Sequence, residues 1–126
     1  MHRSRLAGFI IDCQTDDLER AAGFWSAALG YPRKPHGEED GTAYRQLVTG
    51  PDGLHIEVQR VAHPSRLHLD IETDDIEAEV ARLEGLGARR IERIHTWCVM
   101  EAPTGQRFCV VRPQRADFEE HANVWK

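Results

Sequence analysis

The sequence lacks the marks of secreted and membrane proteins. Its three cysteines, Cys13, Cys98 and Cys109, are odd in number and have no zinc-knuckle or redox-pair spacing. A disulfide framework is therefore not expected, and a reducing, cytoplasmic setting fits best. The N-terminal segment before Asp12 holds only a short apolar stretch, too short for a secretory signal or a membrane span. We expect a soluble protein without a membrane partner.

Two further absences concern charge and loops. The chain has 16 Lys and Arg against 21 Asp and Glu, a net charge of −5, and both signs are scattered along it. Without a basic stripe, nucleic acid is not an expected partner. No glycine-rich loop follows a strand and opens a helix, and there is no serine nucleophile elbow. Phosphate-loop and serine acyl-transfer chemistry are therefore not indicated.

What the sequence does contain is an internal repeat. The segment FIIDCQTDDLER at 9–20 returns as LHLDIETDDIEA at 67–78, an offset of 58 positions. PDGLHIEVQR at 51–60 matches PTGQRFCVVR at 103–112, an offset of 52. We interpret the 126 residues as a single domain built from two copies of one module. The expected bounds are about 6–62 for module 1, about 66–113 for module 2 and 114–126 for a C-terminal tail.

Each copy has the same expected order of elements. Residues 8–14 and 66–72 have the pattern of strands. A helix follows each, with Asp16 and Asp74 as expected N-caps, and Gly30 and Gly87 as stops. Three strand-like runs come next in each module, at 31–34, 42–49 and 53–61, and at 88–94, 96–102 and 106–112.

This order predicts an α+β fold. Two βαβββ modules in tandem would form curved mixed sheets around a cavity. Each helix covers only one face of its sheet, and the uncovered faces would curl toward each other.

The motifs resemble a known superfamily. DDLERAAGFWSAALGY, PDGLHIEV, HLDIETDDIEAEVARLEGLGA and APTGQRFCVV, in this order, are similar to the glyoxalase, bleomycin-resistance and extradiol-dioxygenase proteins, also called vicinal oxygen chelate proteins. The Phe24-Trp25 pair is typical of the small glyoxalase-like subgroup. The resemblance covers roughly residues 6–113 and implies paired βαβββ modules, a small-molecule ligand in the cavity and, as often in the family, a homodimer. A monomer with both modules paired internally also fits the pattern.

The resemblance also implies positions for metal ligands. Metal-using members carry them on the first and last strands of each module, here Ile10, Glu57, His68 and Cys109. Glu57 and His68, with Cys109 as a candidate third ligand, would hold a divalent ion such as zinc, manganese, iron or nickel. Ile10 offers no ligand atom, and Cys109 stands where a carboxylate is expected. The alternative for Cys109 is a small buried residue of an apolar strand.

Alternation along the strands adds polar groups to the same faces. Asp12 lies two residues from Ile10, and Asp70 two residues from His68. The two aspartates occupy equivalent places in the copies and are candidates for general acid or base catalysis; alternatively, each accepts structural hydrogen bonds. His68, oriented by Asp70, could remove a proton next to a carbonyl, or it could be a structural histidine.

These residues indicate two main functions, and a partner module whose cavity has no ligand is a third that the sequence leaves open. The first is an enzyme acting on a small oxygenated organic substrate by metal- or carboxylate-assisted proton transfer, of the lyase, isomerase or dioxygenase type. Its catalytic residues would be Glu57, His68, Asp12 and Asp70, and the ionisable lining favours it. The alternative is a metal-free protein that binds an antibiotic or another small molecule, as in the bleomycin-resistance branch, and the missing ligand at Ile10 favours that reading.

Overall fold

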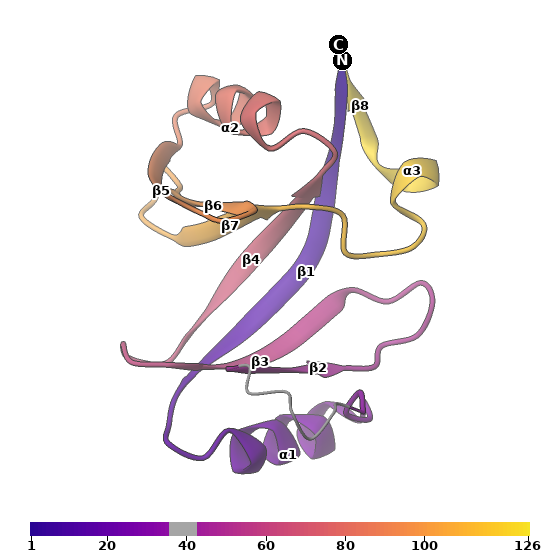
Figure 1. Cartoon of the computed structure of the whole chain (residues 1–126), viewed down its shortest axis with the longest axis vertical. Coiled ribbons are helices and arrows are strands. Elements are labelled where there is room, and N and C mark those ends of the chain that lie inside the picture. The colour runs from indigo at the N-terminus through magenta and orange to yellow at the C-terminus, as the bar shows by residue number, and fades with distance from the viewer. Residues whose placement is uncertain (36–42) are drawn as a thin grey trace. The chain divides into compact units, whose positions relative to one another are not determined.

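The computed structural model describes residues 1–35 and 43–126 and has an α+β fold in which a βαββ unit is followed by a βαβββ unit (Figure 1). The chain divides into two compact units. The first unit is Phe9–Leu67, and the second combines Met1–Gly8 with His68–Lys126. Strand β1 (His2–Gln14) contributes residues to both units. No helix among the described residues is long and apolar enough to cross a membrane.

The first unit contains the C-terminal part of β1 and three further elements: α1 (Leu18–Leu29), β2 (Tyr44–Leu47) and β3 (His55–Val61). The strand order is β2-β3-β1, and β2 runs antiparallel to β3 with Gln46 opposite Glu57. The strand expected at 31–34 is reduced to one bridge between Arg33 and Leu47. Pro32 lacks the amide hydrogen that a longer ladder requires.

Helix α1 covers one face of this small sheet. Buried apolar residues from the helix and the strands form the core between them: Ile11, Leu18, Ala22, Leu47, Ile56 and Val58. Because successive side chains of a strand point to opposite faces, His55 and Glu57 of β3 lie on the face turned away from α1.

The second unit holds the remaining elements. They are β4 (Arg66–Thr73, of which the first two residues belong to the first unit), α2 (Ile76–Gly85), β5 (Arg89–Ile94), β6 (Trp97–Glu101), β7 (Arg107–Val111), α3 (Phe118–His121) and β8 (Asn123–Trp125). The strand order is β4-β7-β6-β5. The β4–β7 pair is parallel and the other two pairs are antiparallel. Strand β8 pairs with the start of β1.

Helix α2 covers one face of this second sheet. Its Val80 and Leu83 pack against side chains of β6 and β7 that alternate along the strands: Cys98, Met100, Phe108 and Val110. The residues between them, such as Val99 and Cys109, therefore face away from α2.

Both helices begin one residue later than expected. The N-caps are Asp17 and Asp75, whose carboxylates accept from the amides of Arg20 and Ala78, and not Asp16 and Asp74. The predicted N-cap Asp74 instead accepts from the amide of Arg3 at 2.8 Å, so a long-range contact decided between neighbouring aspartates. Gly30 caps α1 in the left-handed region at φ 76° and Gly87 follows α2 at φ 106°, as glycine readily does.

The C-terminal tail is fixed to the second unit by a buried charge cluster. Glu72 accepts from Arg5 Nε at 2.6 Å and from the amides of Gln114 and Arg115 at 2.6 and 3.1 Å. Arg5 also donates to Asp117 at 2.6 Å. The side chains of Arg5 and Glu72 are 9% and 0% exposed. These contacts thus join β1, the Glu72 carboxylate of β4 and the C-terminal tail.

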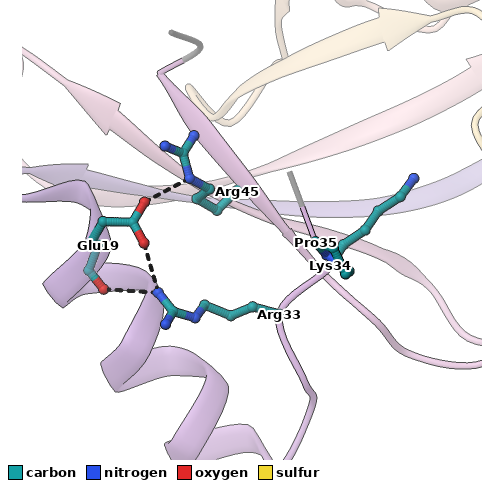
Figure 2. Close-up of a pocket in the computed structure, with 5 residues that line it drawn as sticks. All are labelled: Glu19, Arg33, Lys34, Pro35 and Arg45. Carbon is teal, nitrogen blue, oxygen red and sulfur yellow. Dashed lines mark hydrogen bonds and ion pairs between the residues drawn. The ribbon is translucent and has the colours of Figure 1, made fainter. Parts of the chain in front are cut away.

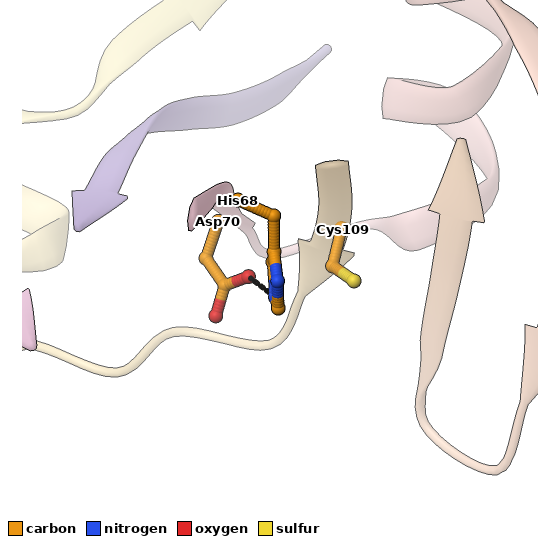
Figure 3. Close-up of side chains that lie close together, drawn as sticks. All are labelled: His68, Asp70 and Cys109. Carbon is orange, nitrogen blue, oxygen red and sulfur yellow. Dashed lines mark ion pairs between the residues drawn. The ribbon is translucent and has the colours of Figure 1, made fainter. Parts of the chain in front are cut away.

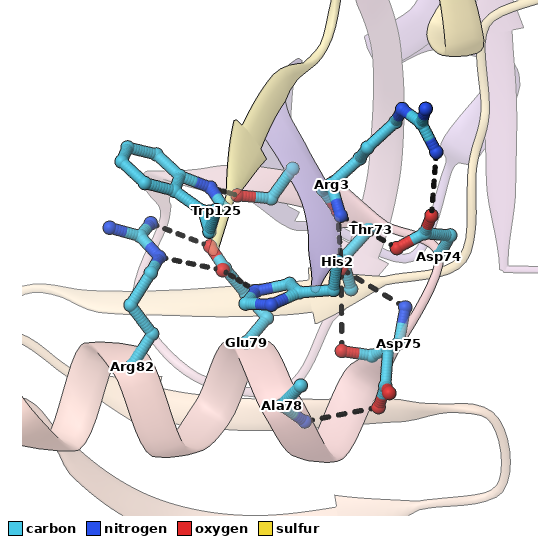
Figure 4. Close-up of polar contacts among 10 residues, drawn as sticks. His2, Arg3, Thr73, Asp74, Asp75, Ala78, Glu79, Arg82 and Trp125 are labelled. Atoms are coloured by element: carbon cyan, nitrogen blue, oxygen red, sulfur yellow. Dashed lines mark hydrogen bonds and ion pairs between the residues drawn. The ribbon is translucent and has the colours of Figure 1, made fainter.

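A second polar cluster joins both chain termini to α2 (Figure 4). The buried Glu79 carboxylate contacts His2 Nε2 at 2.8 Å and both Nε and Nη2 of Arg82 at 2.8 Å. Trp125 stacks on the Arg82 guanidinium, 4.0 Å from ring centroid to Cζ, and donates from Nε1 to Ser4. A charge this deeply buried requires such partners.

Candidate functional site

The candidate site lies on the face of the second unit's sheet that α2 leaves uncovered. His68 and Asp70 on β4 share this face with Cys109 on β7, because Asp70 is the register partner of Cys109 in the parallel pair. The fold thus brings together, from two strands, residues about 40 positions apart in the sequence.

These three side chains converge (Figure 3). One ligand atom from each, a nitrogen, a carboxylate oxygen and a sulfur, lies within 4.8 Å of the others. His68 Nε2 is 3.5 Å from Asp70 Oδ1, a buried atom that receives no hydrogen bond within the described part of the chain. Such a mixed set suits a borderline divalent ion such as zinc, so the residues present fit a metal.

The other predicted site residues lie in the first unit. Glu57 Oε1 contacts His55 Nε2 at 2.6 Å, and His55 Nδ1 lies 3.3 Å from the Gln46 side-chain amide. Asp12 is buried, 3.9 Å from Arg66 Nε. Ile10 is also buried. Glu57 is therefore placed in a carboxylate–imidazole pair within the first unit.

The structure adds Asp70 to the candidate ligands His68 and Cys109. The signal was present, because Asp70 follows His68 by two positions and must share its face. It also adds Arg107, which precedes Cys109 by two positions on the same face. Alternation along the strand would have placed Arg107 on this face from the sequence alone.

A separate cavity of about 330 Å³ lies in the first unit (Figure 2). It is lined by Glu19, Arg33, Lys34, Pro35 and Arg45. Glu19 accepts from Arg33 at 2.9 Å and from Arg45 at 2.8 Å. None of the predicted site residues lines this cavity. Its two arginines, Arg33 and Arg45, are already bonded to the Glu19 carboxylate.

Comparison with family models decides the relationship. Residues 8–111 match the model described as the glyoxalase-like domain. The chain belongs to the glyoxalase-like domain family. This places it in the vicinal oxygen chelate superfamily and confirms the resemblance found in the sequence. Its α+β glyoxalase fold is also confirmed, with the first copy one strand short of the expected βαβββ order. A search of curated proteins gave no match to this glyoxalase-like chain.

Solved structures share the fold at low sequence identity. A hypothetical protein from Bacillus halodurans is 10% identical with a TM-score of 0.63, covering 89% of this chain and 96% of its own. Methylmalonyl-CoA epimerase from Mycobacterium tuberculosis is 16% identical with a TM-score of 0.61, covering 86% and 87%. A Streptomyces coelicolor methylmalonyl-CoA epimerase variant in complex with 2-nitronate-propionyl-CoA is 13% identical with a TM-score of 0.53, covering 89% and 97%. The glyoxalase-like chain therefore shares the fold of these epimerases, and its identity to them does not fix its reaction.

Proposed function

We propose that this glyoxalase-like protein is an enzyme that moves a proton next to a carbonyl group of a small oxygenated organic substrate. The observation that carries the proposal is the convergence of His68, Asp70 and Cys109 within 4.8 Å on the sheet face opposite α2. Structural neighbours that are named as epimerases support it. Clusters of ionisable groups with no packing role are typical of catalytic sites.

His68, Asp70 and Cys109 would hold a divalent ion. Bound there, the ion would polarise the substrate carbonyl and so acidify the adjacent C–H bond. With no ion in place, Asp70 orients the His68 ring as a proton acceptor. We propose Glu57, held by His55, and Asp12 as further acid–base residues, and the protein as a cytoplasmic homodimer.

A specific observation favours the alternative of a metal-free binding protein. Ile10 is a buried apolar residue at a position where the resemblance expects a ligand, so one of the four family positions offers no ligand atom. In this alternative the polar face would hold a small molecule by hydrogen bonds alone.

Cobalt titration of the purified, chelator-treated protein tests the ligand set. Co²⁺ bound by a thiolate gives a charge-transfer absorption band, which we expect in the wild-type protein. Cys109→Ser should abolish the band, and Asp70→Asn and His68→Ala should weaken Co²⁺ binding by at least about tenfold. The matched control is Glu57→Gln, which removes a carboxylate outside the group and should leave Co²⁺ binding unchanged.

Hydrogen exchange into substrate in D₂O tests the reaction. NMR follows the loss of the C–H hydrogen next to the carbonyl, at C2 of the methylmalonyl group of methylmalonyl-CoA and at C3 of small 2-oxo acids, with and without Co²⁺. Exchange that disappears in Asp70→Asn supports the proposal. A protein that binds these compounds without exchange, and takes up no Co²⁺, is the metal-free binder. If Glu57→Gln loses Co²⁺ while Asp70→Asn keeps it, the ligand set is the one expected from the sequence.

A further inference from the structure

A basic residue lies beside the candidate metal cluster on the same sheet face. Strand β7 alternates, so Arg107 faces the same side as Cys109. Across the antiparallel pair, Arg107 stands opposite Glu101 of β6, just as Cys109 stands opposite Val99. Two residues along a strand span about 7 Å, so the base of Arg107 lies about that far from the base of Cys109.

The bonds of Arg107 leave one end of its guanidinium available. Its Nε donates to Glu101 Oε2 at 3.2 Å. Glu101 also accepts from Arg89 Nη2 at 2.8 Å, and hydrogen bonds from the two arginines hold the pKa of Glu101 below its ordinary value. The carboxylate thus stays charged and fixes Arg107 by its Nε edge. Within the described residues, neither terminal nitrogen of Arg107 has a hydrogen-bond partner.

We propose that Arg107 binds an anionic group of the substrate, a carboxylate by preference, while the reacting carbonyl lies at His68, Asp70 and Cys109. This inference rests on the proposed function, because it assigns a substrate class to the same site. The paired terminal N–H groups of a guanidinium match the two oxygens of a carboxylate. The spacing of about 7 Å along the strand suits a short-chain oxo acid or its thioester.

A purely structural role for Arg107 accounts poorly for this arrangement. The Arg107 side chain is 37% exposed and that of Glu101 26%, and an ion pair this exposed contributes only about 0–1 kcal/mol to stability. Arg89, the other cation bonded to Glu101, is more exposed still. Of the two arginines bonded to Glu101, Arg107 lies on the same strand as Cys109. Its terminal N–H groups could bind a ligand.

Isothermal titration of the chelator-treated protein with malonate tests the proposal, with the neutral malonamide as an isosteric probe. Wild-type protein should bind malonate saturably and malonamide at least about tenfold more weakly, because a charge-assisted bidentate pair is lost. Arg107→Gln should reduce malonate affinity by at least about tenfold, and Arg107→Lys should give an intermediate loss, since lysine keeps the charge without the fork. Arg93→Gln removes the same charge from the opposite face of this sheet, where Arg93 pairs with Glu77, and should have no effect.

Three results would overturn the inference: equal binding of malonate and malonamide, equal malonate affinity in Arg107→Gln and wild type, or no malonate binding. Co²⁺ titration of Arg107→Gln separates this inference from the proposed function. Intact Co²⁺ uptake with unchanged malonate affinity refutes the role of Arg107 and leaves the metal cluster standing. Absent Co²⁺ uptake in the wild type, with malonate binding that depends on Arg107, refutes the metal cluster alone.

Discussion

Replacing Arg5 by methionine should destabilise the protein strongly. Methionine keeps most of the side-chain length and removes the charge, so Glu72 would keep its two amide donors and lose its counter-ion in a place where its side chain is 0% exposed. Removing one partner of a buried ion pair costs about 3–5 kcal/mol. The same variant releases Asp117 and the contact of the guanidinium with Phe118, 5.8 Å from the ring centroid.

The control for this variant lies on the same strand. Arg3 also pairs with an aspartate, Asp74, at 3.9 Å, but the two side chains are 36% and 38% exposed. Arg3→Met should therefore lower the free energy of unfolding by only about 0–1 kcal/mol. Urea unfolding followed by far-ultraviolet circular dichroism measures both variants under the same conditions.

A double variant tests the physical reason. In the Arg5→Met background, Glu72→Gln removes the stranded charge, while the glutamine carbonyl can still accept from the amides of Gln114 and Arg115. We expect it to restore at least about 1 kcal/mol of the loss, because an uncompensated buried charge is the main penalty. A loss in Arg5→Met no larger than in Arg3→Met, or a further loss on adding Glu72→Gln, would refute the reasoning.

Two further predictions concern α2. Burial, the largest influence on Glu79, would raise its pKa, but bonds from Arg82, His2 and Ser4 outweigh it and hold the pKa below the ordinary 4.5. The contribution of Glu79 is thus fully present above pH 4.5 and is lost as the pH falls through the lowered value. Glu79→Gln should cost about 1–3 kcal/mol at pH 7 and less near pH 3; an equal cost at both values in urea unfolding would contradict this. Asp75→Ala removes the N-cap bond to the Ala78 amide and should lower the free energy of unfolding, measured by urea unfolding, by about 1 kcal/mol. Asp74→Ala is the comparison, and a larger loss in that variant would make Asp74 the cap.

Local patterns in the sequence predicted most of the secondary structure. The alternation around Met100 and Phe108 gave β6 and β7 within a residue or two of their observed ends, because a strand that is buried on one face must alternate. The glycines after the two helices predicted the helix ends, because glycine readily adopts the left-handed conformation that ends a helix. The N-caps were wrong by one position, because neighbouring aspartates are chemically equivalent as caps. In the structure Asp74 contacts the Arg3 amide instead, and the amides of the actual caps, Asp17 and Asp75, donate to Thr15 and Thr73.

The contacts that fix the tail and the site could not be found in this way. Glu72 is 67 residues from Arg5 and 42 from Gln114, and nothing local marks these residues as partners. The strand register that sets Asp70 beside Cys109 is likewise a property of the sheet. His68 and Cys109 were proposed as ligands from the family resemblance, and the geometry adds Asp70 to them. The assignment of Glu57 as a ligand stays a prediction.

Because β1 contributes residues to both compact units, the protein cannot be divided simply between its two repeats. The chain repeats itself at the level of sequence, yet its first eight residues belong to the compact unit formed by the second repeat. A fragment that starts at the second repeat would contain Glu72 and Glu79 without Arg5 and His2. Exchange of repeats between relatives, or expression of one alone, must therefore carry the amino-terminal segment along with the later half of the polypeptide.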